Sequence, residues 1–469
     1  MFERFKKFVN KVVSKMLSKK IIQKEIDVNI NISDDMASAI EKWINLYEDK
    51  PPWLDEQTHS MGIPVTIASE IARLVTVEFE SEIIDNEYLN EQYQNFIQNI
   101  RRYVEYACAK GGLVFKPFFN GENIEVEFIQ ADNFFPVSSN LRGDITSAVF
   151  TYFLKKDNKL YTRLEYHELK GKDYYIHNFA YEKANYDLDN INYNNLGNQV
   201  PLNSIIEWSD IQPKTLIQNI DKPLFSYFKM PLANNIDDKS PLGVSVYSRA
   251  INLIEQLDRQ YSRILWEYEG KELAVYISEM MLKINVKTNE KELPKGNARL
   301  YRILKGESDG DLYKEFSPEI RDNSLFNGLN ELLRKIEFNC GLAYGTLSNI
   351  NESDKTATEI KASKQRSYST IKDIQNSLQY SLENLVYSMR VICRLHNLPG
   401  DKYDMSFNFD DSLVMDKDLE LASMQADVAA GILRPEIYLS KKYGITEDEA
   451  IKMMPIYPNT SKEPFESEE

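Results

Sequence analysis

The chain has 469 residues and a formal net charge of −16, from 56 lysines and arginines against 72 aspartates and glutamates. Its length is sufficient for about two to four hydrophobic cores, so we expect a multidomain protein. The acidic balance excludes a protein that coats nucleic acid through a generally basic surface, although local basic patches remain possible.

Residues 1–20 form a basic amphipathic pattern and are predicted to be a helix. Apolar side chains recur on one face and lysines occupy the remainder. We interpret this segment as a peripheral helix that packs on its own protein or on a neighbouring subunit. Binding to a membrane surface is the alternative interpretation of the same pattern.

The next region predicts two helices followed by β structure. Ile63–Ile83 has apolar residues at helical spacing with Pro64 near its start, and a second helix is predicted over Tyr88–Ala109. Asn120-Gly121 lies between alternating apolar runs, which is a strong hairpin signal. Three aromatic-rich segments then predict further strands, at Ala148–Leu154, Leu160–His167 and Tyr174–Tyr181. We expect a mixed α+β domain.

A second pair of helices is predicted on either side of a compact insert. Ser240 and Pro241 supply an N-cap and a first-turn proline for a helix over Ser240–Glu269. The return helix is predicted over Asp322–Gly341, and any of its first three residues could cap it. Short segments separated by proline and glycine predict a β-rich insert, with strands at Leu273–Ile277, Met281–Val286, Arg299–Leu304 and Leu312–Phe316.

A loop rich in Gly, Ser and Asn, Ala343–Lys355, precedes a long predicted helix over Ala357–Asn397. Thr356 and Glu359 have the spacing of a capping box, which fixes where the loop ends. The polar stretch Lys361–Thr370 predicts a kink. Beyond a Pro-Gly break, two or three short helices are predicted over residues 417–454, followed by an acidic tail without fixed structure.

The motifs of common enzymes are missing from the sequence. There is no phosphate-binding loop, no dinucleotide fingerprint, no His-Glu-x-x-His and no Cys-x-x-Cys. His167 and His177 are expected to be surface residues on two neighbouring strands. Acidic pairs such as Asp237-Asp238 and Asp410-Asp411 could hold Mg²⁺, but in so acidic a chain they are typical of solvated loops. We predict no enzymatic activity, no cofactor and no metal.

The cysteines and the hydropathy pattern bear on where the protein is made. Cys108, Cys340 and Cys393 are widely spaced in apolar helical contexts, which favours neither a disulfide framework nor a thiolate metal site. No apolar run approaches the roughly 20 residues needed to span a bilayer, and the N-terminus lacks signal-peptide features. We expect synthesis in the cytoplasm and no membrane partner.

Basic residues on the two bracketing helices are candidates for contact with a passing phosphate backbone. They are Arg249, Arg259, Arg263, Arg334 and Lys335. Salt bridges between subunits would use the same side chains equally well, so both roles remain open.

Three segments carry a family resemblance. The first bracketing helix and the entry to the insert read SPLGVSVYSRAINLIEQLDRQYSRILWEYEGKELAVYI. The return helix, loop and long helix read LNELLRKIEFNCGLAYGTLSNINESDKTATEIKASKQRSYSTIKDIQ. Together with the hairpin AKGGLVFKPFF, they resemble the portal proteins of tailed bacteriophages, of the Siphoviridae type with an SPP1-like portal. The resemblance extends over about Ile63–Met454, and the order of the parts is its most specific feature.

This resemblance implies an α+β portal-type fold with an α/β wing, a two-helix stem, a small β-rich clip, a long kinked helix and a helical C-terminal crown. By position, the implied parts are the wing 1–238 with its N-terminal helix 1–20, the first stem helix 239–269, the clip 270–320, the second stem helix 321–342, the tunnel loop 343–355, the long wing helix 356–398, the crown 399–455 and the disordered acidic tail 456–469.

The resemblance also implies a function. Such portals form rings, usually of twelve subunits, at one capsid vertex of the virion, after assembly in the host cytoplasm. The ring nucleates the prohead, docks the terminase motor, conducts double-stranded DNA without sequence specificity during packaging and ejection, and anchors the head–tail connector. The implied partners are the terminase large subunit, the major capsid and scaffolding proteins, and the head–tail adaptor. ATP hydrolysis would belong to the terminase, which agrees with the missing phosphate-binding loop.

Under this resemblance the tunnel loop contributes the DNA-channel candidates. They are Leu347, Ser348, Asn349, Asn351, Ser353 and Lys355. The loop's composition suits a mobile constriction, and Lys355 is its one basic side chain. A dozen copies at −16 each would surround the channel with net negative charge, so DNA would slide past rather than adhere.

Two other classes of function remain as alternatives. A metal-dependent nuclease or other head-processing enzyme would show Mg²⁺-stimulated cleavage of plasmid DNA. A peripheral membrane scaffold would bind liposomes through residues 1–20. Neither alternative accounts for the helix pair and its insert.

Overall fold

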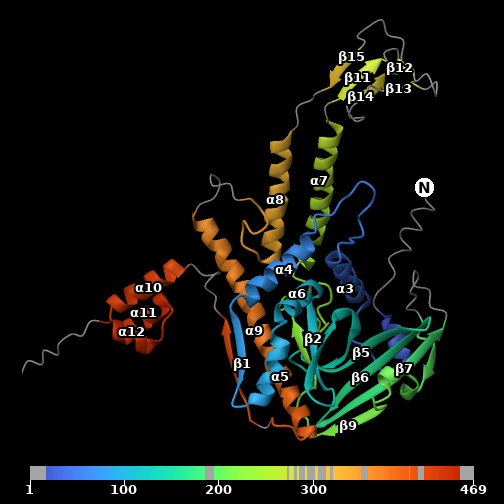
Figure 1. The fold of residues 1–469 in the computed structure, drawn as a ribbon, viewed down its shortest axis with the longest axis vertical. Helices are drawn as coiled ribbons and strands as arrows, with labels where there is room; N and C mark the ends of the chain where they lie inside the picture. The colour runs from blue at the N-terminus through green and yellow to red at the C-terminus, as the bar shows by residue number, and fades with distance from the viewer. Residues whose placement is uncertain are drawn as a thin grey trace, which may run out of the picture. The chain divides into compact units, whose positions relative to one another are not determined.

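The computed structural model describes residues 17–184, 195–271, 274–278, 283–284, 291–292, 301–304, 313–316, 321–349, 357–400, 402–409 and 417–454. The chain divides into two compact units, Met1–Phe409 and Asp410–Glu469. Helices and β-sheets alternate along the first unit (Figure 1). This mixture confirms the predicted α+β class.

The described chain begins with three helices, α2 (Lys19–Ile26), α3 (Asp34–Tyr47) and α4 (Ile63–Thr76). Ser33 caps α3, because its hydroxyl oxygen accepts a hydrogen bond from the amide of Met36 at 3.1 Å. Each of α3 and α4 buries its apolar face, with Trp43 and Ile67 fully buried. Most of the predicted N-terminal amphipathic helix lies outside the described residues, and only its last two residues, Lys19 and Lys20, fall in α2.

The predicted helix Ile63–Ile83 is too long. α4 ends at Thr76, and Phe79–Ile84 is instead the strand β1. β1 pairs antiparallel with β16 (Asp404–Phe409), and the rings of Phe79 and Phe409 lie 4.8 Å apart. A partner strand so far along the chain leaves no trace in local apolar spacing, so tertiary pairing decides the conformation here.

The predicted helix Tyr88–Ala109 is also wrong in one respect, because it is two helices, α5 (Glu87–Ile97) and α6 (Ile100–Lys110). Asn86 caps α5 through its side-chain oxygen. The helix closes at Gln98-Asn99, whose amides bond back to carbonyls of α5. Both halves keep the predicted apolar face, which is why one periodic pattern ran through the break.

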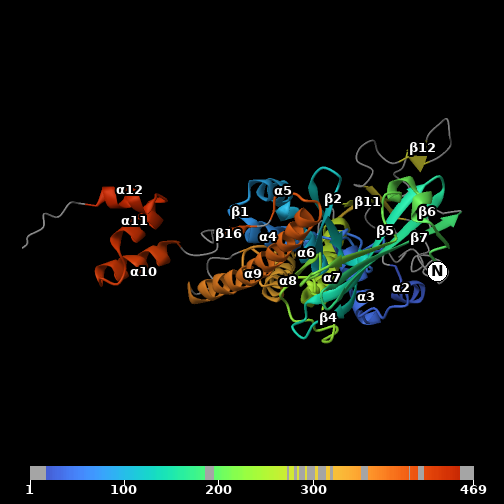
Figure 2. The ribbon, with the colours of Figure 1, turned by 90° about the horizontal axis from the view of Figure 1, so that it is seen from below.

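Two antiparallel sheets form the β part of this region. β2 (Gly112–Phe119) and β3 (Ile124–Gln130) are the predicted hairpin, and β10 (Ser226–Lys229) adds a strand beside β2. The larger sheet has the order β4-β5-β6-β7-β8, with β9 also paired to β7. Its strands are β4 (Phe134–Ser139), β5 (Ile145–Lys156), β6 (Lys159–Lys170), β7 (Asp173–Ala184), β8 (Asn198–Val200) and β9 (Lys214–Gln218). β5, β6 and β7 lie side by side in Figures 1 and 2, which confirms the three predicted strands.

The prediction that His167 lies at the surface is wrong, although β6 and β7 are neighbours as expected. His167 is 3% exposed, and its ring nitrogens lie 2.6 Å from the Tyr174 hydroxyl and 2.6 Å from Oε1 of Glu165. Arg163 and Glu165 share its side of the strand, since alternate residues of a strand face the same way. β6 therefore buries a face made of polar side chains. The alternation of residues along the strand separates its two faces, but it does not show which face is buried.

The helix predicted over Ser240–Glu269 begins later than expected. A 3₁₀ turn, Ser248–Ala250, leads into α7 (Ile251–Gly270), and the residues before it are not helical. Gly243 passes so close to the end of α6 that a Cβ on it would lie 2.2 Å from the carbonyl oxygen of Gly111. The amide of Val246 in this segment also donates a hydrogen bond to the carbonyl oxygen of Cys108 in α6, at 3.0 Å. The Ser-Pro pair therefore precedes a segment that crosses α6, and it does not cap α7.

Short strands lie between α7 and the return helix α8 (Asp322–Cys340), as predicted. They are β11 (Ala274–Ser278), β12 (Lys283–Ile284), β13 (Lys291–Glu292), β14 (Tyr301–Leu304) and β15 (Tyr313–Phe316). β11 is central, parallel to β14 and antiparallel to β15, and β12 pairs with β13. The four predicted strands each overlap an observed one, and β13 is additional.

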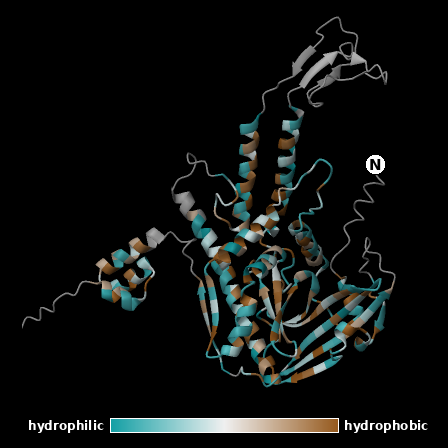
Figure 3. Cartoon of the chain, in the orientation of Figure 1, coloured by the Kyte–Doolittle hydropathy of each residue, from teal (hydrophilic) through white to brown (hydrophobic). Residues whose placement is uncertain are grey.

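Two helices complete the first unit. α8 ends at Gly341, which adopts the left-handed conformation with φ of +71°, in agreement with the prediction. α9 (Ala357–Leu395) is a single helix whose length confirms the predicted long helix to within two residues. Its fully buried residues, which include Leu378 and Leu385, follow one stripe. The predicted capping box involves Thr356, which lies outside the described residues. In Figure 3 the ribbon colours for hydrophobic and hydrophilic residues alternate along α7, α8 and α9.

Residues 417–454 of the second unit form three short helices, α10 (Lys417–Ala429), α11 (Pro435–Tyr443) and α12 (Glu447–Met453). This agrees with the two or three helices predicted. Thr446 and Glu449 form a capping box at the start of α12. In the part of this unit that the structure describes, Ala450 is buried, whereas Ile432 is 79% exposed and Met453 is 58% exposed. The predicted acidic tail lies outside the described residues.

Candidate functional site

The predicted site consists of the helix pair α7 and α8 and the segment that follows α8. The two helices pack against each other along their apolar faces, with Ile254 and Leu257 of α7 and Ile336 of α8 fully buried. Towards the insert, Arg321 just before α8 donates to the carboxylate of Glu267 on α7, at 3.2–3.3 Å. The helix pair is thus joined by apolar contact along its length and by an ion pair near its end.

α7 is also fastened to the segment that precedes α4. Asp258 of α7 is 1% exposed, and its carboxylate accepts hydrogen bonds from the indole N–H of Trp53 at 2.8 Å and the amide of Met61 at 2.9 Å. One turn later, Ser262 accepts a bond from the amide of His59 at 2.8 Å. Burial raises the pKa of Asp258. These bonds fix the position of α7 relative to the segment that precedes α4.

Three of the five basic candidates have partners within the chain. Arg259 pairs with Glu255 at 2.9 Å, Arg334 pairs with Glu331 at 2.5 Å, and the guanidinium of Arg249 donates to a carbonyl oxygen at 3.3 Å. The side chain of Arg334 is only 18% exposed. Local ion pairs therefore offset part of the positive charge that the helices carry.

Arg259 and Arg263 line a pocket of about 450 Å³ together with Trp266 of the same helix. The facing wall is the segment of residues 56–59. Trp266 is 69% exposed, and Glu56 and Glu269 also reach the pocket. The pocket is therefore mixed in charge rather than a uniformly basic phosphate site. Lys335, the fifth candidate, is an exposed residue of α8.

The segment after α8 is organised by one buried carboxylate. Oε1 of Glu337 accepts hydrogen bonds from the amides of Gly345 at 3.1 Å, Leu347 at 2.6 Å and Ser348 at 2.8 Å. Its other oxygen, Oε2, accepts one from the Ser348 hydroxyl at 2.8 Å. Glu337 is 0% exposed. Hydrogen bonds from several N–H and O–H donors compensate a buried carboxylate for the water that it loses on burial.

A second side chain of α8 binds the same segment further along. Asn330 accepts a hydrogen bond from the amide of Asn349 at 2.8 Å and donates one to its carbonyl oxygen at 3.1 Å. Asn330 and Glu337 are seven residues apart, so they lie on the same face of the helix. The first part of the predicted tunnel loop is therefore bonded to α8 at both of its ends.

α9 contacts the end of α8 and the start of this segment. The guanidinium of Arg366 lies 4.3 Å from the ring centre of Phe338 and 5.4 Å from that of Tyr344. A Cβ on Gly341 would lie 2.5 Å from the hydroxyl oxygen of Thr370, so the chain at this point requires glycine for space as well as for its positive φ.

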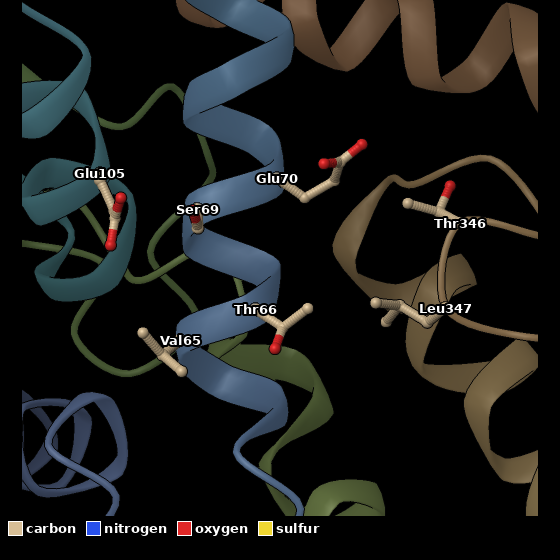
Figure 4. Close-up of a pocket in the computed structure, with 7 residues that line it drawn as sticks. All are labelled: Val65, Thr66, Ser69, Glu70, Glu105, Thr346 and Leu347. Atoms are coloured by element: carbon tan, nitrogen blue, oxygen red, sulfur yellow. The ribbon is translucent and has the colours of Figure 1, made fainter.

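The side of the segment that faces α4 is open. Thr346 and Leu347 line a pocket of about 390 Å³ with Thr66 and Glu70 of α4, and Glu105 of α6 contributes to it. Figure 4 shows Leu347 pointing towards α4 across this space. The Glu105 carboxylate accepts a bond from the Tyr47 hydroxyl at 2.7 Å. The segment is therefore bonded on its α8 side and separated from α4 by a pocket.

The predicted loop residues fall into three groups. Leu347 faces the pocket and Ser348 is buried against Glu337, at 5% exposed. Asn349 is exposed, and its backbone bonds to Asn330. The remaining candidates, Asn351, Ser353 and Lys355, lie outside the described residues.

Glu337 and Asn330 were not among the predicted site residues. The sequence did contain one signal for Glu337, because an acidic residue in the last turn of a helix is opposed by the helix dipole and needs a compensating partner. Asn330 has no comparable signal, because an asparagine on an exposed helix face is ordinary.

The structure also bears on the metal-dependent alternative. Within the ranges that the structure describes, no group of three or more His, Cys, Asp or Glu side chains is arranged to hold a metal ion. Asp237 instead accepts a hydrogen bond from the amide of Lys239 at 3.2 Å, and Asp410-Asp411 lies outside the described residues. Among the helices of the described chain, none combines the length and the hydropathy needed to span a membrane.

Comparison with known proteins gave one family match. The model of the family described as phage portal protein, SPP1 Gp6-like, matches residues 56–455. Among solved structures, the chain is similar to one from the neck of a native GTA particle computed with C12 symmetry, with 9% identity and a TM-score of 0.42. That similarity covers 92% of this chain and 99% of the other. No curated protein matches the chain.

Proposed function

Since the chain belongs to the SPP1 Gp6-like family of phage portal proteins, we propose that it forms a ring at one vertex of a phage capsid and conducts double-stranded DNA through that ring. In this proposal the ring nucleates the prohead, docks the terminase during packaging and anchors the head–tail connector afterwards. The observation that carries the proposal is the family match over residues 56–455, which includes the helix pair, the insert, the following segment and α9.

The proposed parts follow the described elements. The wing comprises the elements up to residue 238 together with α9, the stem is α7 and α8, the clip is the strand-rich insert, and the crown is the C-terminal helices. The stem is the part suited to line a channel, because its two helices are amphipathic and α7 is joined to the wing through Asp258 and Ser262.

The charge distribution favours a conduit over a binding surface. The chain carries −16, and Arg259 and Arg334 on the stem are already paired with glutamates. On the described part of the stem, these ion pairs reduce the positive charge that can neutralise DNA phosphates, which weakens binding to DNA. Weak attraction permits the DNA to move through the channel.

We assign the DNA-facing role within the loop to Asn349, Asn351, Ser353 and Lys355. Leu347 faces the pocket beside α4, and Ser348 is hydrogen-bonded to Glu337, so neither side chain is assigned to DNA. On the stem, Arg263 and Lys335 remain the candidates for transient contact with phosphates, and Arg249, Arg259 and Arg334 are assigned to bonds within the protomer.

Native mass spectrometry with negative-stain microscopy of the purified protein tests the proposal. Twelve copies of a 54.6 kDa chain give about 655 kDa, and a closed ring with a central channel is the expected assembly. A protein that stays monomeric at high concentration would contradict the proposal. Incubation with plasmid DNA and Mg²⁺ provides the second arm, because cleavage would favour a nuclease.

A further inference from the structure

The Gly, Ser and Asn content of the segment that follows α8 predicts a mobile loop. Its first part has a different character in the structure, since three of its amides and one hydroxyl converge on the single carboxylate of Glu337. We propose that Glu337 is a positioning residue that fixes residues 345–349 to α8, so that this part of the loop is a rigid extension of the helix.

The electrostatics of the site support a role in positioning. A fully buried carboxylate without partners would be strongly unfavourable, so Glu337 is stabilised only when the segment closes around it. The same bonds satisfy amides of Gly345, Leu347 and Ser348 that belong to no helix or sheet. Each side of the interaction therefore requires the other, and opening the segment would expose four donors and one buried charge together.

Asn330 extends the attachment. It lies two helical turns before Glu337 on the same face and binds both the amide and the carbonyl oxygen of Asn349. The segment is thus held at Gly345 to Ser348 by one side chain and at Asn349 by another. Two attachments along one helix face determine its direction as well as its position.

The neighbours of the segment indicate that α8, and not α4 or α9, determines its position. On the α4 side, Thr346 and Leu347 border a pocket rather than a packed interface (Figure 4). On the α9 side, the contact is the stacking of Arg366 on the rings of Phe338 and Tyr344, and Phe338 is itself part of α8.

The inference rests on the proposed function in one step only. If the helix pair lines a DNA channel, Glu337 sets where the chain leaves α8 and thereby where the exposed Asn349 is presented. The attachment itself is a property of the folded chain and can be tested without DNA.

Hydrogen exchange of the purified protein, followed by mass spectrometry, tests the attachment. In Glu337→Ala we expect the amides of Gly345, Leu347 and Ser348 to exchange at least about tenfold faster than in the unaltered protein, because they lose a charged acceptor. Glu337→Gln should restore most of the protection, since its side-chain oxygen can still accept the three amides. Glu331→Ala is the matched control, because Glu331 lies on the same helix, is 59% exposed and pairs with Arg334 rather than with the segment after α8.

Unchanged exchange at Gly345, Leu347 and Ser348 in a folded Glu337→Ala protein would overturn the proposal, and so would equal acceleration in Glu331→Ala. If Glu337→Ala does not fold, Asn330→Ala tests the second attachment by itself. Faster exchange at Asn349 supports the proposal, and unchanged exchange contradicts it.

The same variants in a DNA-packaging assay separate the two proposals. Faster exchange combined with altered packaging supports both the attachment and the channel role. Faster exchange with normal packaging retains the attachment and counts against a role of this segment in the channel.

Discussion

Nζ of Lys116 on β2 lies 2.6 Å from Oε1 of Glu165 on β6, and both side chains are less than a tenth exposed. The pair joins the sheet of β10, β2 and β3 to the larger sheet that contains β6. Arg163 and His167 also lie 2.6 Å from the same carboxylate. Removing one partner from such a group leaves buried charge unbalanced, which costs far more than the intact pair contributes.

Lys116→Met should therefore lower the free energy of unfolding by about 3 kcal/mol, because Glu165 loses its ammonium partner in a buried site. Denaturation in guanidinium chloride, followed by circular dichroism, measures the loss. Lys156→Met is the matched control, since Lys156 and Glu207 form a pair with both side chains 40% exposed. Its cost should stay below about 1 kcal/mol, and similar losses in the two variants would contradict the argument.

Acid should weaken the same cluster. Burial lowers the pKa of His167 from its ordinary 6.5. Burial alone would raise the pKa of Glu165, but Lys116, His167 and Arg163 together hold it well below the usual 4.5. Both folded-state pKa values are depressed, so the unfolded chain binds protons first as the pH falls. The stabilisation is complete above pH 6.5 for His167 and above pH 4.5 for Glu165, and is lost below those values.

Thermal unfolding between pH 7 and pH 5 measures this effect. The midpoint should fall over that interval, and His167→Gln should reduce the fall because the group that gains a proton on unfolding is gone. His177→Gln is the comparison, since burial also lowers the pKa of His177 but the residue is only partly buried. A pH dependence that does not change in His167→Gln would contradict the assignment.

Two glycine substitutions should have opposite effects. A Cβ on Gly243 would lie 2.2 Å from the carbonyl oxygen of Gly111. Because that oxygen belongs to the backbone, the two chain segments would have to separate to relieve the overlap. Gly243→Ala should therefore destabilise the protein by more than about 2 kcal/mol or prevent folding. Gly328 lies within α8, and nothing is within 4 Å of a Cβ there, so Gly328→Ala should stabilise it by about 0.5–1 kcal/mol. Denaturant titration of both variants checks the sign.

Lys355→Ala tests the role proposed for the loop in DNA movement. Lys355 is the one basic side chain between residues 343 and 355, so its removal should reduce retention of packaged DNA while ring assembly remains intact. The amount and length of DNA recovered from particles measure retention. Lys172→Ala is the control, because Lys172 is a 73% exposed lysine of the large sheet's turn. Normal retention in Lys355→Ala would count against the gating role.

The elements that the sequence predicted well are those in which local pattern and tertiary environment agree. From Ile371 onwards α9 has an apolar stripe, and its predicted end at Asn397 lies two residues beyond the observed Leu395. The β2–β3 hairpin has its turn residues between alternating runs, so its register follows from local chemistry. Asp157 and Asn158 both have positive φ, as a tight turn between β5 and β6 requires.

The errors occur where distant segments decide the structure. Residues 79–84 have apolar spacing that fits a helix, yet they pair with β16. Ser240-Pro241 has the chemistry of a helix start, but the chain beyond it is held by close approach to Gly111. Glu337 reads as an ordinary helical glutamate until the segment after Gly341 closes on it. Each of these contacts depends on the fold, so no pattern within one helix or strand could reveal it.

The pairing of β1 with β16 has a consequence for synthesis on the ribosome. β1 emerges early, whereas its partner is the last strand of the first unit, so at about 5–20 residues per second β1 waits for tens of seconds with an unpaired edge. Such an edge can join a neighbouring nascent chain. Glu80 and Glu82 occupy the exposed face of β1 and place two negative charges on each copy. Their mutual repulsion disfavours pairing between two such strands until β16 has been made.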